Sequence, residues 1–442
     1  MKHNMRQHFK VGCALLLLTV ATSSRAQQDS CANELSIGIQ HLSHGEIRDG
    51  GLPRPLDPKK TVEDRANFVL GRTRLSFDYQ RKGLEAKVVA QNLAVWGMQG
   101  GEAIELYEGW IRLSSPCGLF AQMGRMALAY DDERILGPND WAMAALSHDV
   151  LRLGYEGHGH KAHAILAYNQ NASNIDSGTF YENGSQPYKT MQTLWYHYDV
   201  PVVPVGASLL FMNIGMQAGE KDKDPHTEWQ QLLGGYLSFH PKHFTLEGSY
   251  YKQMGKNEQE IKIDTWMASV KAKVQPSDNY GIVAGYDYLS GDDYVPVIKP
   301  NMLGLPRHEK IKGFSPVYGS HHKFFGFMDY FYESAYTQGF TPGLQNAFAG
   351  FNLMPLKGLT VGATYHYLAV TTELDKLDRT LGHAIDVEAS YRFSKDISLA
   401  AGYSFMKGTD TMDQLKQGNG SRSVRWGWLS FVVSPSLFTV KW

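Results

Sequence analysis

Arginine side chains recur within the first third of the sequence, in segments where polar and apolar residues alternate. They are Arg72, Arg74, Arg112, Arg125 and Arg152. A guanidinium group presents a planar fork of N–H donors that binds carboxylates and phosphates through paired hydrogen bonds. Because the alternation turns each of these side chains toward one compartment, together they would form a path for anions. The alternative is that they pair with acidic neighbours and only stiffen the wall that carries them.

Two further basic residues extend this set. Arg134 lies in a polar loop with Asp131, Asp132 and Asp140, so any of these carboxylates could pair with it. Lys271 lies in a later alternating segment and is expected to face the same compartment as the arginines.

Acidic side chains are expected on the same face as the arginines, so the face is not uniformly basic. They are Glu85, Glu108, Asp386 and Glu388. Charges of both signs on one face can tune the selectivity of a pathway or pair with one another.

A candidate nucleophile lies near the start of the chain, in His41-Leu42-Ser43. Side chains two positions apart share one face of a strand, so His41 could accept the hydroxyl proton of Ser43. A hydrolase also needs a third group to orient the histidine, and Glu46 is the only acidic neighbour in the sequence.

Histidines gather at two other places, His158, His160 and His163 in an expected turn, and His321 and His322 in a long loop. Neither group has the cysteines or carboxylates that complete a known metal-ligand spacing. The sequence also has no phosphate loop, no dinucleotide fingerprint and no basic stripe. We therefore expect no metal, no cofactor and no nucleic-acid partner.

The elements that must position these residues begin after a targeting segment. Basic residues precede an apolar stretch of residues 11–21, and Ser24-Arg25-Ala26 follows it. This pattern is typical of a secretory signal peptide, so residues 1–26 are predicted to be cleaved. Cys31 and Cys117 then remain, and the sequence alone leaves open whether they form a disulfide bond.

Many short segments of the mature chain alternate polar and apolar residues. In residues 68–79, for example, arginine, serine and aspartate alternate with leucine and aromatic residues. Counting such segments predicts about 18 strands, joined alternately by short turns and long loops, as in transmembrane barrels. Tryptophans and tyrosines at strand ends, such as Trp110, Trp195 and Tyr196, are expected in the interfacial girdles.

The loop of residues 291–340 is too long for a simple connection. Its many aromatic residues argue against disorder, and those singled out as a constriction are Phe324, Phe325, Phe327 and Tyr330. We expect this loop to fold into the barrel or over its mouth. The alternative is an external cap that packs on neighbouring loops.

A family resemblance is carried by residues 124–153. They contain Gly124-Arg125-Met126, a run from Tyr130 to Gly137, Asp140-Trp141, and a run from Ser147 to Leu153. This block resembles the core signature of the alginate-export porins, and the segments at 72–97 and 322–331 are similar to parts of their relatives. The resemblance implies a monomeric outer-membrane barrel of eighteen strands with an arginine-lined lumen. His148 stands where that family usually has an aromatic residue.

Together these patterns predict an all-β, antiparallel, up-and-down transmembrane barrel over residues 27–442. Its short turns would face the periplasm, its long loops the exterior, and its partners would be outer-membrane lipid and the insertion machinery that reads the terminal Trp442. The expected function is passive passage of hydrophilic solutes, anionic ones in particular, or polysaccharide, without catalysis. The alternatives are a structural or adhesive barrel, and an acyl hydrolase whose His41/Ser43 pair is similar to the His-x-Ser motif of outer-membrane phospholipases.

Overall fold

A computed structural model describes most of the chain. The described residues are 33–49, 65–98, 104–171, 175, 178–182, 184, 186–293, 310–329, 341–374, 376–416 and 423–442. The expected signal peptide, Cys31 and Tyr330 lie outside these ranges. The structure therefore does not describe whether Cys31 and Cys117 form a disulfide bond.

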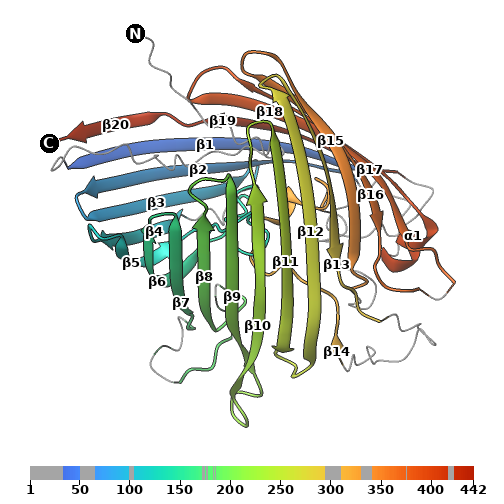
Figure 1. Cartoon of the computed structure of the whole chain (residues 1–442), viewed down its shortest axis with the longest axis horizontal. Coiled ribbons are helices and arrows are strands. Elements are labelled where there is room, and N and C mark those ends of the chain that lie inside the picture. The colour runs from blue at the N-terminus through green and yellow to red at the C-terminus, as the bar shows by residue number, and fades with distance from the viewer. Residues whose placement is uncertain are drawn as a thin grey trace.

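The described residues fold into one closed antiparallel barrel of 18 wall strands (Figure 1). The expected strand number is therefore confirmed. Each strand pairs with the next along the chain, and the first wall strand pairs with the last to close the ring. The first nine are β1 (Glu34–Asp49), β2 (Arg65–Arg81), β3 (Leu84–Val95), β4 (Ile104–Ser114), β5 (Leu119–Met126), β6 (His148–Gly157), β7 (His160–Tyr168), β8 (Thr190–Asp199) and β9 (Val205–Ala218).

The second half of the wall continues the same up-and-down order. Its strands are β10 (His226–Phe239), β11 (Phe244–Lys256), β12 (Lys262–Ser277), β13 (Tyr280–Leu289), β15 (Leu344–Leu356), β16 (Leu359–Ala369), β17 (Thr380–Arg392), β18 (Ile397–Gly408), β19 (Ser423–Val433) and β20 (Ser436–Lys441). The segments β19 and β20 form one wall strand that is interrupted beside Pro435, which has no N–H to donate to β1.

Short elements decorate the long connections. The short strand β14 (Lys310–Ile311) pairs in parallel with β12, and the 3₁₀ turn η2 (His321–Lys323) follows it. The helix α1 (Asp410–Lys416) lies between β18 and β19. No helix in the described part of the chain is long and apolar enough to cross a membrane.

Strand alternation separates two environments. On β2 the side chains of Arg72 and Arg74 are buried on the inner face, whereas Leu75 and Phe77 are 36% and 40% exposed on the outer face. The strands form because this period of two places apolar side chains toward lipid while polar ones point inward. The outer wall is therefore an apolar belt around a partly polar interior.

Turn chemistry fixes the ends of the hairpins. Gly118 ends the β4–β5 turn with a φ of +91°, and an added Cβ there would lie 2.5 Å from the carbonyl oxygen of Glu156. Only glycine tolerates this combination of left-handed backbone and close approach. The tight turn thereby keeps β4 in register with β5 and packs against β6.

The interior is not uniform along the barrel. Near the long loops the inward positions are apolar and almost fully buried, as at Met191, Met212, Met267 and Met406. They pack against loop residues 127–147 and 314–328, which fold into the barrel and share one hydrophobic cluster with the wall. Toward the short turns the inward positions are mostly polar. The loops thus narrow one half of the lumen.

Two predicted girdle tryptophans lie elsewhere. Tyr196 is exposed on the outer wall as expected, but Trp110 and Trp195 point inward, where their indole N–H groups donate to Glu108 at 3.3 Å and Asp131 at 3.1 Å. The prediction was wrong for these two because aromatic type at a strand end does not reveal which face the side chain occupies. An indole whose N–H finds a hydrogen-bond acceptor can also lie on the inner face of the barrel.

Candidate functional site

The β5–β6 loop, residues 127–147, crosses the barrel and is held at β2 by two arginines. Arg72 Nη2 lies 3.1 Å from Asp140 Oδ2, and Arg74 Nη1 lies 2.7 Å from Asp140 Oδ1. Arg72 also donates to the carbonyl oxygens of Asp140 at 3.2 Å and Met143 at 3.3 Å. Two guanidinium groups therefore share one carboxylate, which leaves this contact with a net positive charge.

Both arginines keep unused hydrogen-bonding capacity. Arg74 donates to Gln91 at 3.0 Å and lies over the ring of Tyr107 at 3.8 Å, and its Nη2 atom is buried without a hydrogen-bond partner among the described residues. The side chain of Arg72 is fully buried, and its Nε atom also has no hydrogen-bond partner among the described residues. Buried donors without partners are uncommon in folded proteins and favour binding of an acceptor.

On another side of the barrel the same loop is held by Arg134. Its Nε atom lies 3.2 Å from Asp132, and its Nη2 atom lies 3.1 Å from Asp287 of β13 and 2.9 Å from Ser269 of β12. Burial alone would lower the pKa of Arg134, but the carboxylates of Asp287 and Asp132 outweigh it and raise the pKa above its usual value. The loop is thus anchored to strands that are far apart around the ring.

The two inward loops also join each other. Leu136 and Tyr318 form a parallel β-bridge, in which Gly137 N–H donates to Tyr318 O at 2.9 Å. An ion pair between Lys323 and Glu133 lies beside this bridge.

Three of the predicted constriction residues lie in this inward assembly. Phe324 stacks under the Arg134 guanidinium at 3.9 Å, and Phe325 is buried. The backbone N–H of Phe327 donates to Asp386 of β17 at 2.9 Å. Residues 314–328 of the expected constriction loop therefore pack inside the barrel rather than forming an external cap. Tyr330 is outside the described residues.

A second basic cluster lies closer to the short turns, on β4 to β7. Arg112 pairs with Glu156 at 3.0 Å and lies over the Phe120 ring at 3.7 Å, and His163 contacts the same carboxylate at 3.1 Å. Arg152 differs because its partners are neutral. It donates to Gln122 and, at 3.3 Å, to the hydroxyl oxygen of Tyr130.

No carboxylate pairs with Arg152 among the described residues, and its Nε atom is buried there without a hydrogen-bond partner. Its charge is thus the least compensated of the predicted basic set. Lys271, by contrast, lies inward on β12 and pairs with Glu247 of β11.

Arg125 departs from the predicted orientation. It shares the outer face of β5 with the exposed Leu119 and Met123, and pairs with Asp149 through bonds of 2.7 and 2.9 Å. Arg125 lies near the long-loop end of the strand, where a barrel tolerates charge on its outer wall. It therefore cannot contribute to an inward basic path.

The predicted His41 and Ser43 also lie on the outer wall. His41 Nε2 is 3.0 Å from Ser43 Oγ, and His41 Nδ1 is 2.9 Å from Thr73 Oγ1. Glu46, the expected orienting acid, faces inward instead and contacts His44 at 3.1 Å and Arg48 at 2.6 Å. The third group is therefore a neutral hydroxyl, which cannot compensate an imidazolium charge as a carboxylate does.

Sequence reasoning missed an aromatic cluster that fastens both loops to the wall. Trp141 of the β5–β6 loop stacks on His322 of η2 at 4.0 Å and 5°, and contacts His44 of β1 edge-on at 4.8 Å. Its ring also lies 5.1 Å from Trp428 of β19. The only sequence signal was the adjacency of Trp141 to Asp140, since the other rings are distant along the chain.

A group of three potential metal ligands was also missed. His226, Glu228 and Glu260 lie at the long-loop ends of β10 and β11, with ligand atoms within 4.8 Å of one another. Lys256 Nζ lies 3.3 Å from the Glu228 carboxylate, so one of the ligands is already paired with a cation. Glu260 is brought in by a loop, which residue spacing does not reveal.

Comparison with known proteins supports the fold. No family model and no curated protein sequence matches the chain. Among solved structures it is similar to Pseudomonas aeruginosa OccK11 (OpdR), with 11% identity, a TM-score of 0.58, and coverage of 92% of this chain and 96% of that one. Acinetobacter baumannii OccAB1 gives 12% identity, a TM-score of 0.58, and coverage of 91% and 97%.

These similarities, the apolar outer wall and the closed ring define the class of protein. The chain is an outer-membrane β-barrel with an Occ-like fold. At such low identity the comparisons show the fold alone. The resemblance to alginate-export porins stays a sequence resemblance that no family match supports.

Proposed function

We propose that the chain is a passive channel for small hydrophilic anions, narrowed by its own inward loops. The observation that carries the proposal is the shared Asp140, which leaves one of two guanidinium charges on β2 uncompensated. This net positive charge beside the lumen favours an anionic solute over a neutral one. Residues 127–147 and 314–328 would together form the constriction.

A carboxylated sugar is the cargo class that fits this lumen best. The basic groups would bind its carboxylate, while Phe324 and Trp141 supply aromatic surface beside the path. A polyuronate such as alginate belongs to this class, as the resemblance in residues 124–153 suggests. The inward acidic groups of β17, Asp386 and Glu388, would weaken binding enough to allow release.

The remaining sequence predictions belong to the same proposal. Residues 1–26 direct export, Trp442 is read by the insertion machinery, and the barrel works as a monomer in lipid without a cofactor.

Arg152 and Arg125 provide a matched pair for the test. They lie on neighbouring strands, one inward without a carboxylate and one outward in an ion pair. The measurement is the reversal potential in planar bilayers under a salt gradient. We expect the wild-type reversal potential to indicate anion selectivity. It should move toward zero in Arg152→Gln and stay at the wild-type value in Arg125→Gln. Equal reversal potentials in all three proteins would contradict the proposed anion path.

Acyl hydrolysis is a second candidate because His41 and Ser43 are within hydrogen-bonding distance on a lipid-facing wall. The neutral Thr73 in the third position argues against activity. We expect purified wild type to release no fatty acid from phospholipid micelles above the level of Ser43→Ala. Release that requires Ser43 would establish the enzyme instead.

A further inference from the structure

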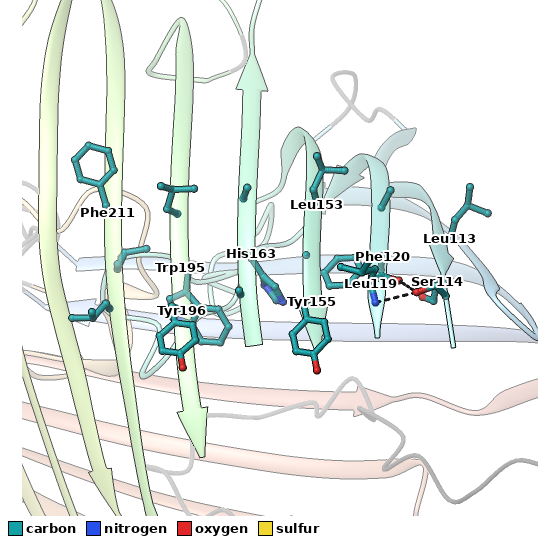
Figure 2. Close-up of a pocket in the computed structure, with 18 of the residues that line it drawn as sticks. Leu113, Ser114, Leu119, Phe120, Leu153, Tyr155, His163, Trp195, Tyr196 and Phe211 are labelled. Carbon is teal, nitrogen blue, oxygen red and sulfur yellow. Dashed lines mark hydrogen bonds between the residues drawn. The ribbon is translucent and has the colours of Figure 1, made fainter. Parts of the chain in front are cut away.

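The outer wall carries an apolar groove of about 990 Å³ over strands β4 to β10. Figure 2 shows it from the side, with Leu153 and Tyr155 on one strand and Tyr196 on another. Its volume is at the upper end of the range for small-molecule sites, which is roughly 300–1,000 Å³. The groove lies on the face opposite to the lumen, so the proposed channel does not use it.

A slot along β7 forms the centre of the groove. Its floor is Ala162 and Ala164, both on the outer face. Ala164 lies between Leu153 and Leu194, and Ala162 lies between Tyr155 and Tyr196. The two walls are therefore two strand spacings apart, about 10 Å, which admits one extended hydrocarbon chain.

One end of the slot is polar. The next outward residue of β7 is His160, whose Nδ1 lies 2.7 Å from the Tyr196 hydroxyl and whose ring stacks on Tyr198 at 4.4 Å. Its Nε2 atom has no hydrogen-bond partner within the described ranges. The exposed His158 lies beyond His160, in the turn before β7. Figure 2 shows the Tyr155 and Tyr196 hydroxyls directed toward this same end of the slot.

We propose that this slot binds one glycerophospholipid of the periplasmic leaflet, with an acyl chain over Ala162 and Ala164 and its phosphate at His160. The apolar floor and walls match a hydrocarbon chain. The imidazole and the two phenol groups match a phosphate at the height where aromatic residues meet lipid headgroups. The periplasmic leaflet follows from the position of the slot at the short-turn end.

A second copy of the barrel fits the slot less well. Apolar side chains on a flat neighbouring wall would leave the floor unfilled and would offer no acceptor to His160 Nε2. A glycerophospholipid supplies both an acyl chain and a phosphate on one molecule.

The test is native mass spectrometry of the full barrel in detergent with added palmitoyl-oleoyl phosphatidylethanolamine. Ala162→Leu/Ala164→Leu fills the floor, and the matched control Ala268→Leu/Ala272→Leu adds the same bulk to outward positions of β12. We expect one retained lipid in the wild type and control, and roughly tenfold weaker retention in the filled variant, the effect of losing about two buried methylene groups. His160→Ala should weaken retention while leaving the slot open.

Equal retention in the wild type and the filled variant would overturn the proposal. So would a wild-type dimer that the floor substitutions dissociate, because the slot would then belong to a second copy. The filled variant should keep the conductance of the wild type, so failure of the lipid site is distinguishable from failure of the channel.

Discussion

Asp140 is the residue on which the position of the inward loop depends at β2. Its replacement by asparagine leaves Arg72 and Arg74 without their carboxylate. Removing one partner of a buried pair costs roughly 3–5 kcal/mol, and because Asp140 is 28% exposed we expect about 2 kcal/mol. Asp140→Asn should therefore lower the free energy of unfolding in urea by this amount and increase current noise.

Asp149→Asn is the matched control for this change. It breaks the Arg125 pair on the outer wall, where Asp149 is 45% exposed, so it should cost less than about 1 kcal/mol. Similar losses in both variants would show that the Asp140 contact does not hold the loop.

Sequence reasoning at the residue scale located most of the inward basic residues but not their partners. Arg72, Arg74, Arg112 and Arg152 face inward because strand alternation is local and readable. Arg125 does not, because a charge near a strand end is tolerated on either face. Partners such as Asp140 for Arg72 depend on how a loop folds across the barrel, which spacing cannot specify.

At the scale of elements, the β-bridge between Leu136 and Tyr318 joins the two inward loops. Residues paired in this way lie close enough for a disulfide, whose Cα atoms are about 4.4–6.8 Å apart. In a chain with Cys31→Ser and Cys117→Ser, we expect Leu136→Cys/Tyr318→Cys to oxidise readily and shift in a non-reducing gel.

The neighbouring pair Leu136→Cys/Val317→Cys is the control, since side chains of adjacent residues in an extended segment point in opposite directions. Equal crosslinking of both pairs, or of neither, would indicate that the loops do not meet as the structure places them.

The strands and short turns were predictable from the sequence because the residues within each segment determine them. Period-two alternation and the short turns gave the strand number. Helix α1 has no such local signal, because its seven residues are stabilised by burial of Met412 and Leu415 rather than by helix propensity. The inward fold of residues 310–329 depends on contacts with the wall that no local pattern encodes.

At the scale of the whole molecule, the pairing of β1 with β19 and β20 closes the ring, and Trp442 lies at the end of this pairing. Trp442 exchanges two backbone hydrogen bonds with Asn33, at 2.8 and 3.1 Å, while its side chain stays exposed. Trp442→Ala should therefore leave the unfolding free energy within about 1 kcal/mol of the wild type in vitro, yet reduce assembly in cells. Phe438→Ala on the same segment is the control, and undiminished assembly of Trp442→Ala would argue against recognition of the terminal residue.

Solute flux tests the central claim most directly, namely that the lumen conducts small hydrophilic anions past its inward loops. Liposomes containing the purified barrel are placed in isotonic sodium galacturonate or in galactose, and their swelling is followed by light scattering. We predict faster swelling than in protein-free liposomes. Galacturonate should enter faster than galactose, and this difference should be smaller in Arg152→Gln. Swelling no faster than in protein-free liposomes would contradict the account.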